Sequence, residues 1–237
     1  MHISGAGSIA AGVYDEALSI SGSGRLMGDV RCLAFDGSGS IGAVGNLDCD
    51  ETAEMSGSVR IEGSLTAKKI DISGSCGIDG DCTANEEMRV SGSIRCGGNF
   101  RAMCVRCFGS VSVCGHIEAE RVHLAGGVSC HGGIGAAESI EIETGANAGR
   151  AVMLIAKEIT VKRERRQCLL SRLFHRRRCF AVSEKIEGDK LALDGVKTPL
   201  VIGESVKIGK HCDIDCVRYS ESIDIHSKAK VGKVERI

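Results

Sequence analysis

Apolar and polar residues alternate along this chain in short pairs that recur at a fixed interval. Ser-Gly or equivalent dipeptides place glycines 17 or 18 residues apart, and a second glycine follows each of them after six residues. Counted from the first glycine of each repeat, apolar residues stand at −4 and −2, at +2 and +4, and at +8 and +10. The first glycines of the regular repeats are Gly22, Gly39, Gly57, Gly74, Gly92, Gly109 and Gly126.

This alternation predicts strands rather than helices. A spacing of two residues is typical of a strand with one buried face, and a helical spacing of 3.6 is absent from the repeats. Three short strands per repeat, separated by corners that glycine permits, form a triangular coil. Because one coil cannot bury its own interior, the coils must stack. We therefore predict an all-β fold, a triangular parallel β-helix (β-solenoid), and the general preference of parallel crossovers favours a right-handed one.

The repeat divides the chain into three segments. A main β-helix covers residues 1–161, because the pattern begins with Gly5 and still holds at Ile159 and Val161. A basic amphipathic insertion covers 162–182, and degenerate coils with longer turns cover 183–237. The less regular predicted pairs are Ala146 with Ala148, Val152 with Leu154, Leu191 with Leu193, Leu200 with Ile202, Val206 with Ile208, and Cys212 with Ile214.

Composition narrows the class of protein. Hydrophobic residues make up 43% and charged residues 26% of the chain, which excludes a disordered polypeptide. Aromatic residues make up only 3%, so small aliphatic side chains must fill the interior. The 13 cysteines are an odd number and fit a reducing cytosol better than a disulfide framework. No apolar run reaches the roughly 18 residues that cross a bilayer and no secretory signal precedes the repeat, so we expect a cytoplasmic protein.

Three segments share the coil sequence Ser-Gly-Ser-φ-x-φ-x-Gly-x-φ-x-Ala, where φ is apolar: Ser56–Ala67, Ser73–Ala84 and Ser91–Ala102. This sequence resembles the coils of bactofilins, the bacterial polymer-forming cytoskeletal family, well over residues 3–160 and weakly over 183–237. The resemblance implies a right-handed β-helix that assembles end to end into nonpolar filaments without nucleotide or other cofactor. It also implies a scaffold that recruits other proteins, often at the inner face of the membrane. Bactofilins usually flank a shorter β-helix with disordered tails, whereas this repeat starts at Met1 and carries an insertion.

The ends of the repeat favour self-assembly independently of the resemblance. A parallel solenoid exposes strand edges and apolar residues at its ends unless polar caps cover them. No cap precedes Ile3, and the last apolar pair lies a few residues before Ile237. A monomeric binding module, closed by its longer C-terminal turns, is an alternative. We predict a homopolymer whose interface is formed by Ile3, Ile9, Val13, Ile223, Ile225 and Val231.

An outward column at position −3 changes from acidic to basic along the repeats. Such a column is either a solvated face or a bias for lateral pairing. Its members are Asp36, Glu54, Asp71, Arg89, Arg106 and His123.

The insertion carries the one amphipathic helical pattern of the chain. Eight basic residues oppose a single acidic one between 162 and 178, although the whole chain has a net charge of −1. Apolar and arginine-rich faces together suit an interfacial helix on an anionic membrane. An acidic protein partner and a solvated loop are alternatives, and nucleic acid is not expected because no aromatic residues are interleaved for base stacking. The predicted contact residues are Arg165, Arg166, Leu169, Leu170, Arg172, Leu173, Phe174, Arg176, Arg177 and Arg178.

Motifs for chemistry are weak. Gly37–Gly42 matches a dinucleotide-binding fingerprint, but the motif has meaning only between a strand and a helix. Cys104 and Cys107 form a CxxC whose side chains should point to opposite faces. Seven cysteines occupy inward positions and are interpreted as small hydrophobic residues. They are Cys32, Cys49, Cys76, Cys82, Cys96, Cys107 and Cys130.

One cluster could suit a metal. Cys114, His116 and His131 flank the same corner of successive coils and should point outward, although three separate surface side chains are the simpler interpretation. The alternative enzyme class is a left-handed β-helix acyltransferase, which also uses coils of 18 residues. Its hexapeptide pairs a large aliphatic residue with a small one and needs a histidine beside an extended loop, and the repeats here show neither. We therefore predict a structural protein, not an enzyme, with no catalytic residue, cofactor or metal site.

Overall fold

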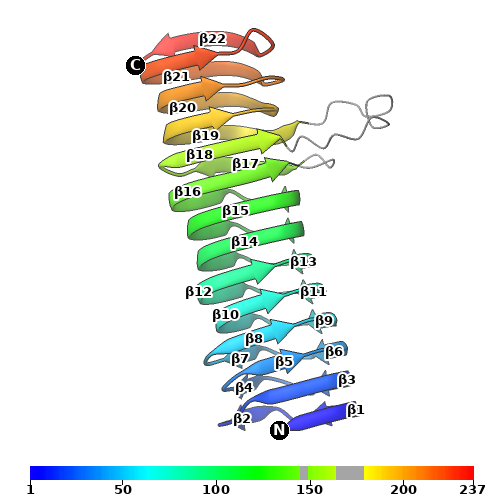
Figure 1. Cartoon of the computed structure of the whole chain (residues 1–237). Coiled ribbons are helices and arrows are strands. Elements are labelled where there is room, and N and C mark those ends of the chain that lie inside the picture. The colour runs from blue at the N-terminus through cyan, green and yellow to red at the C-terminus, as the bar shows by residue number, and fades with distance from the viewer. Residues whose placement is uncertain (145–148, 164–178) are drawn as a thin grey trace, which may run out of the picture. The chain divides into compact units, whose positions relative to one another are not determined.

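A computed structural model describes residues 1–144, 149–163 and 179–237. All regular structure in these residues is β-strand, and the strands pair in parallel with strands of neighbouring coils. The described part of the chain has no helix that could span a membrane. Two compact units are present, Met1–Ala119 and Glu120–Ile237. Each unit is a β-solenoid in which successive coils lie one over another (Figure 1), and the prediction of this fold class is confirmed.

The first unit keeps the regular repeat throughout. Each strand pairs with the strand one repeat later, as Phe35 does with Ala53, Ile41 with Val59, and Leu65 with Cys82. The three strands of one coil occupy three faces, which is the triangular arrangement that the spacing predicts. The strands are β1 (His2–Ile9), β2 (Gly12–Tyr14), β3 (Leu18–Leu26), β4 (Val30–Cys32), β5 (Phe35–Gly37), β6 (Ser40–Ala43), β7 (Leu47–Cys49), β8 (Thr52–Met55), β9 (Ser58–Ile61), β10 (Leu65–Ile72), β11 (Ser75–Ile78), β12 (Cys82–Val90), β13 (Ser93–Cys96) and β14 (Phe100–Val113).

The predicted inward positions form the core. Among the regular repeats, all of them are buried except Gly24, Ala102, Ala119 and Ala136, which are partly exposed. Where the inward position is a glycine, neighbouring side chains take the space, as Ile41 and Phe35 do beside Gly37. The core is therefore narrow and aliphatic, as the low aromatic content requires.

The first glycine of each repeat stands where two coils meet most closely. The carbonyl oxygen of Gly39 accepts a hydrogen bond from the backbone N–H of Ser58 at 2.7 Å. A Cβ atom on Gly57 would overlap that same carbonyl group of Gly39. The same conflict recurs at Gly74, Gly92 and Gly109, each against the preceding first glycine. The glycine spacing therefore records a column of backbone contacts that no larger residue can occupy.

A ladder of polar side chains follows the second glycine of each repeat, a feature that the sequence interpretation missed. The side chain of Asn46 accepts the backbone N–H of Ser64 at 2.8 Å, and in turn the N–H of Asn46 donates to Asp29 at 2.7 Å. Such side-chain acceptors satisfy backbone donors that a corner removes from the strand ladders. The ladder continues with the N–H of Asp81 on Ser64 at 3.1 Å, of Asn99 on Asp81 at 2.7 Å, and of His116 on Asn99 at 3.0 Å.

The second unit has longer strands and coils of variable length. Ile186 pairs with Val201, Val201 with Val217, and Val217 with Val234, so no single repeat length applies. Most of its strands run through corner positions, as β14 already does at Gly109 in the first unit. The strands of the second unit are the greater part of β15 (Ile117–Cys130), which the unit boundary crosses, β16 (Ile134–Thr144), β17 (Arg150–Ile155), β18 (Glu158–Arg163), β19 (Phe180–Leu193), β20 (Val196–Ile208), β21 (Asp213–Ile225) and β22 (Lys230–Arg236).

Two predicted core pairs of the second unit are wrong by one residue. Ala151 is buried with Leu154, whereas Val152 is only partly buried, because β17 carries an irregularity between residues 151 and 153. Val201 is buried in place of Leu200 and Ile202. One extra residue moves every following side chain to the other face. The pair of Ala146 and Ala148 lies outside the described residues.

The strands on either side of the insertion leave fewer residues for it than the sequence predicted. Strand β18 extends to Arg163, beyond the predicted end of the main β-helix at 161. Phe180 and Val182 are buried in β19, so the coils resume before the predicted boundary at 183. The predicted pairs of Leu191 with Leu193 and Val206 with Ile208 are confirmed as buried.

Candidate functional site

The outward residues of the first unit form columns whose charges differ from face to face. On the face made by β5, β8 and the end of β10, Asp36 lies in register with Glu54, and Glu54 with Asp71. These three residues are the acidic column. None of the three carboxylates forms an ion pair or a side-chain hydrogen bond within the described residues. In the next coil, Asp71 lies in register with Arg89, whose pKa is raised mainly by its hydrogen bond with Glu87.

The neighbouring face carries cations separated by glycines. Arg25 lies in register with Gly42, Gly42 with Arg60, Arg60 with Gly77, and Gly77 with Arg95. These five residues are the arginine column. Arg60 pairs with Asp79 at 2.8 Å, whereas the guanidinium groups of Arg25 and Arg95 have no partner in the described part of the chain. The sequence signal for this column was an alternation of arginine and glycine at position +3 of the repeat.

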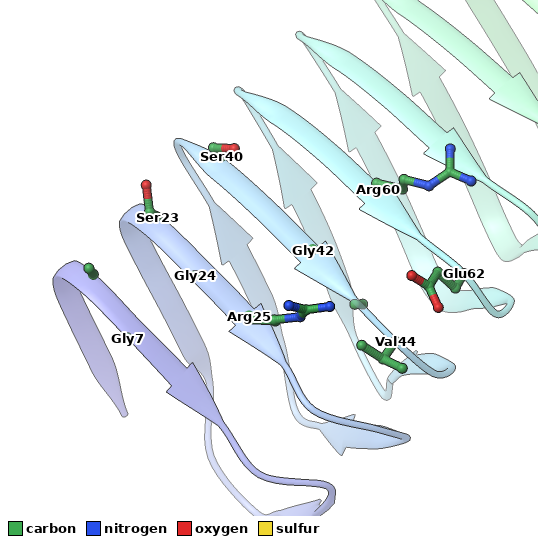
Figure 2. Close-up of a pocket in the computed structure, with 11 residues that line it drawn as sticks. Gly7, Ser23, Gly24, Arg25, Ser40, Gly42, Val44, Arg60 and Glu62 are labelled. Carbon is green, nitrogen blue, oxygen red and sulfur yellow. The ribbon is translucent and has the colours of Figure 1, made fainter.

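A groove of about 500 Å³ follows the arginine column. Figure 2 shows Gly42 on the strand between those that carry Arg25 and Arg60, with Val44 and Glu62 at the same end of the groove. Ser23 and Ser40 line its other end, at the corner toward the acidic column. The groove therefore has a backbone floor, walls that carry two arginines and the single carboxylate of Glu62, and a border of small hydroxyl groups.

The third face of the first unit is neutralised by its own residues. Arg31 pairs with Asp50 at 2.9 Å, and Arg101 pairs with Glu118 at 2.9 Å and with Asp81 at 3.3 Å. On the other two faces, Arg60, Arg89 and Arg106 form ion pairs, whereas Arg25, Arg95 and the three carboxylates of the acidic column form none within the described residues.

The first coil presents an open edge and one exposed apolar side chain. Strand β1 pairs with β3, and no other described strand pairs with β1. Of the predicted interface residues, Val13 is 72% exposed, Ile3 is half-buried, and Ile9 is buried in the core. Ile9 therefore belongs to the interior, and Val13, which lies in register with the exposed Arg31, is an outward position rather than part of the uncovered core edge.

The last coil is open in the same way. Strand β22 pairs with β21 and, within the described residues, with nothing else. Ile223 and Val231 are half-buried and Ile225 is exposed, as the predicted interface requires of accessible residues. Val234, at 45% exposure, and Ile237, at 67%, were not predicted and add to this apolar surface.

The predicted membrane or partner contact residues, from Arg165 to Arg178, lie outside the described residues. The described strands that flank them are β18 and β19.

The inward cysteines are confirmed as core residues. All seven are buried, and the Sγ atoms of Cys32 and Cys49 lie 3.8 Å apart. Burial raises the pKa of Cys76 to about 12 and that of Cys96 to about 11. Because the thiolate is the reactive form, Cys76 and Cys96 are poor nucleophiles and poor metal ligands at neutral pH. Cys104 is only half-buried, on the opposite side of its strand from Cys107.

No group of three or more His, Cys, Asp or Glu among the described residues could hold a metal ion. Cys114 and His116 belong to the first unit and His131 to the second. His131 borders a groove of about 560 Å³ in the second unit, where its Nε2 lies 2.7 Å from a guanidinium nitrogen of Arg150. Arginine can only donate, so this nitrogen accepts and its lone pair is occupied.

The glycines of Gly37–Gly42 span the end of β5 and most of β6 with a short turn between them. The motif thus lies between two strands, and the strand-to-helix turn that holds a dinucleotide phosphate is not formed there.

Comparison of the chain with protein-family models, with curated proteins and with solved structures yields no match.

Proposed function

We propose that this chain is a structural protein that assembles end to end into filaments without nucleotide, as a cytoplasmic scaffold that recruits other proteins. The observation that carries the proposal is the pair of open coils, with β1 and β22 each paired on one edge only among the described strands. An unpaired parallel edge presents backbone donors and acceptors that another strand can satisfy.

The apolar side chains of these coils support the proposal. Ile3 is half-buried and Val234 is 45% exposed, although their partners one coil inward, Ile20 and Val217, are fully buried. Stacking a second copy on either coil would extend the ladder and cover these side chains. Burial of apolar surface contributes about 25 cal/mol per Å², so each covered valine or isoleucine favours assembly.

High-speed pelleting and negative-stain images of the purified protein, without nucleotide, test the proposal. We expect fibres from the native chain, and we expect Ile3→Lys combined with Val234→Lys to abolish them because stacking would bury a charge at both end coils. Met103→Lys is the matched control, since Met103 is 48% exposed on an interior coil. A native chain that stays in the supernatant would contradict the proposal. Discrete trimers would favour the acyltransferase class, and monomers a binding module.

A contact between the basic segment and an anionic membrane surface is the second part of the proposal. The sequence of residues 164–178 supports it through its arginines and interspersed leucines. Deletion of 164–178 leaves the buried Phe180 in place, so the coils should still fold. We expect this deletion to remove co-flotation with vesicles that contain anionic lipid, and neutral vesicles are the control. Unchanged co-flotation would contradict the contact.

A further inference from the structure

We propose that the arginine column of one copy docks on the acidic column of a second copy, so that copies also associate side by side. The proposal adds a lateral contact to the end-to-end assembly proposed above. The lateral contact depends on the end-to-end assembly only in the experiment that measures filament width. The partner is this same chain, because the two columns are complementary in charge and are built on the same coil spacing.

The glycines of the arginine column are the first argument. A Cβ atom on Gly42 would meet no atom within 4 Å, and one on Gly77 would meet only the end of the Arg60 side chain at 3.8 Å. Neither residue has a positive φ. The fold therefore does not require glycine at either position, in contrast to Gly57. A glycine inside a strand weakens it and often marks a place where another molecule approaches the backbone closely.

The second argument is the match of register. Arg25 and Arg60 are two coils apart, with a glycine between them. Asp36 and Asp71 are likewise two coils apart, with Glu54 between them. When the two aspartates face the two arginines, the longer glutamate lies over Gly42, where no side chain stands in its way. The same match exists one step along, with Arg60, Gly77 and Arg95.

Uncompensated charge is the third argument. Like charges directly opposite each other on neighbouring strands destabilise a sheet, and the acidic column stacks three of them. The third face shows that this solenoid can neutralise its charges internally, as Arg31 and Asp50 do. Arg60 already pairs with Asp79 and Asp71 lies beside Arg89, but Arg25, Arg95, Asp36 and Glu54 have no ion pair within the described residues, and a complementary surface would supply one. The exposed serines beside both columns, such as Ser38 and Ser40, are small enough to let the two surfaces meet.

The contact joins two different faces, so a pair of copies leaves one column unused on each copy. A copy that uses its arginine column still offers its acidic column to a third copy. Such heterologous contacts generate open assemblies when the rotation between copies does not close a ring. The expected product is a sheet or bundle of parallel copies.

Charge reversal on one face at a time tests the contact. The first variant carries Arg25→Glu, Arg60→Glu and Arg95→Glu, and the second carries Asp36→Lys, Glu54→Lys and Asp71→Lys. In each variant both faces have the same sign, so lateral association should weaken by on the order of tenfold or more. It is measured by low-speed pelleting and by image width at low salt, and high-speed pelleting reports end-to-end assembly separately. Circular dichroism confirms that each variant is folded.

Mixing the two variants is the decisive measurement. The acidic faces of the first variant then meet the lysine and arginine faces of the second, so both kinds of contact are restored. We expect the equimolar mixture to recover the lateral association that each variant lacks alone. Arg31→Glu, on the third face, is the control and should leave the lateral association of the native sequence unchanged.

A substitution without charge tests the close approach. Gly42→Thr adds a side chain to the floor of the groove, and we expect it to reduce lateral association while the strand is kept or stabilised. Gly135→Thr is the matched control, because a Cβ there also meets nothing within 4 Å but lies in the second unit.

The outcomes separate this inference from the proposed function. Side-by-side oligomers in sedimentation velocity without fibres would contradict the end-to-end assembly and leave the lateral contact standing. Fibres that never associate laterally at low salt would overturn the lateral contact alone. It would also be overturned if the charge-reversed variants associate like the native chain, or if their mixture fails to recover. Association that requires an added polyanion would assign the groove to that ligand instead of a second copy.

Discussion

The two units build the same kind of coil in different ways. In the first unit, most strands before β14 are short and meet at corners held by glycine contacts and by the ladder that includes Asn46 and Asn99. In the second unit, β19 and β20 run through the corners as continuous strands, and the coil length varies. Both units have an aliphatic core, so the core does not explain why only the first unit has a strict repeat. The repeat therefore reflects the glycine contacts and the side-chain hydrogen bonds at the corners of the first unit.

The two units also differ in how charged residues are arranged on their surfaces. The first unit has the acidic and arginine columns, whose regular spacing follows from its constant coil length. The second unit places ion pairs within its own ladders, such as Lys162 with Glu141 at 2.8 Å and Lys190 with Glu158 at 3.1 Å. A constant repeat is therefore also what makes long columns of one charge possible.

The largest expected effect comes from emptying the core of each unit. Phe100 in the first unit and Phe180 in the second are fully buried. We expect Phe100→Ala and Phe180→Ala each to cost about 3–5 kcal/mol through the cavity left behind. Hydrogen exchange read by mass spectrometry should show the loss of protection mainly in the unit that carries the substitution. Equal loss in both units would show that the division into two units has no energetic meaning.

The next effect tests whether glycine at the corners is essential. Gly57→Ala forces a Cβ into the carbonyl group of Gly39, and we expect a loss of about 1–3 kcal/mol in urea unfolding. Gly42→Ala is the matched control within the same unit, because its Cβ meets no neighbour. The control should be neutral or slightly stabilising, since alanine loses less conformational entropy than glycine. Similar losses at both glycines would refute the distinction between corner and strand glycines.

Removing a side chain of the polar ladder should destabilise the protein less than replacing a corner glycine. Asn46→Ala removes the acceptor for the N–H of Ser64, and we expect a cost of about 1 kcal/mol. In the second unit, Ser205→Ala removes an exposed hydroxyl contact of 2.7 Å with Ser222 and should change stability little. Urea unfolding of both variants checks this difference. An equal cost at the two sites would mean that the ladder does not distinguish the units.

The sequence predicted the fold of the first unit almost to the residue because its period is constant. An alternating pattern with fixed spacing leaves one arrangement that buries all inward positions, so the core cysteines and Phe35 followed directly. The pattern failed where an irregular residue changes the parity, at Val152 and at Leu200. Such irregularities depend on local contacts between coils and leave no periodic signal.

The candidate surfaces were predicted only in part. The sequence showed the acidic column as a row of equivalent positions, but whether its carboxylates have partners depends on side-chain directions that a repeat does not specify. The arginine column was missed because its glycines do not stand out in a chain with 32 of them. What distinguishes Gly42 is the empty space around it, and this is visible only in three dimensions.

The smallest expected effect concerns the last coil of the second unit, where ion pairs take the place of the polar ladder. Hydrogen bonds from Lys233 and then from Arg218 lower the pKa of Glu235 below its ordinary value of 4.5. A carboxylate with a lowered pKa in the folded state stabilises it fully above the unfolded value, and this contribution is lost as the pH falls through the folded value. Amide exchange in β22 should therefore become faster, relative to β20, between pH 5 and about pH 3. Glu235→Gln should remove this pH dependence, and the control Glu204→Gln should not. If exchange in β22 of the native chain shows no such pH dependence, the ion pairs of Glu235 do not stabilise the last coil.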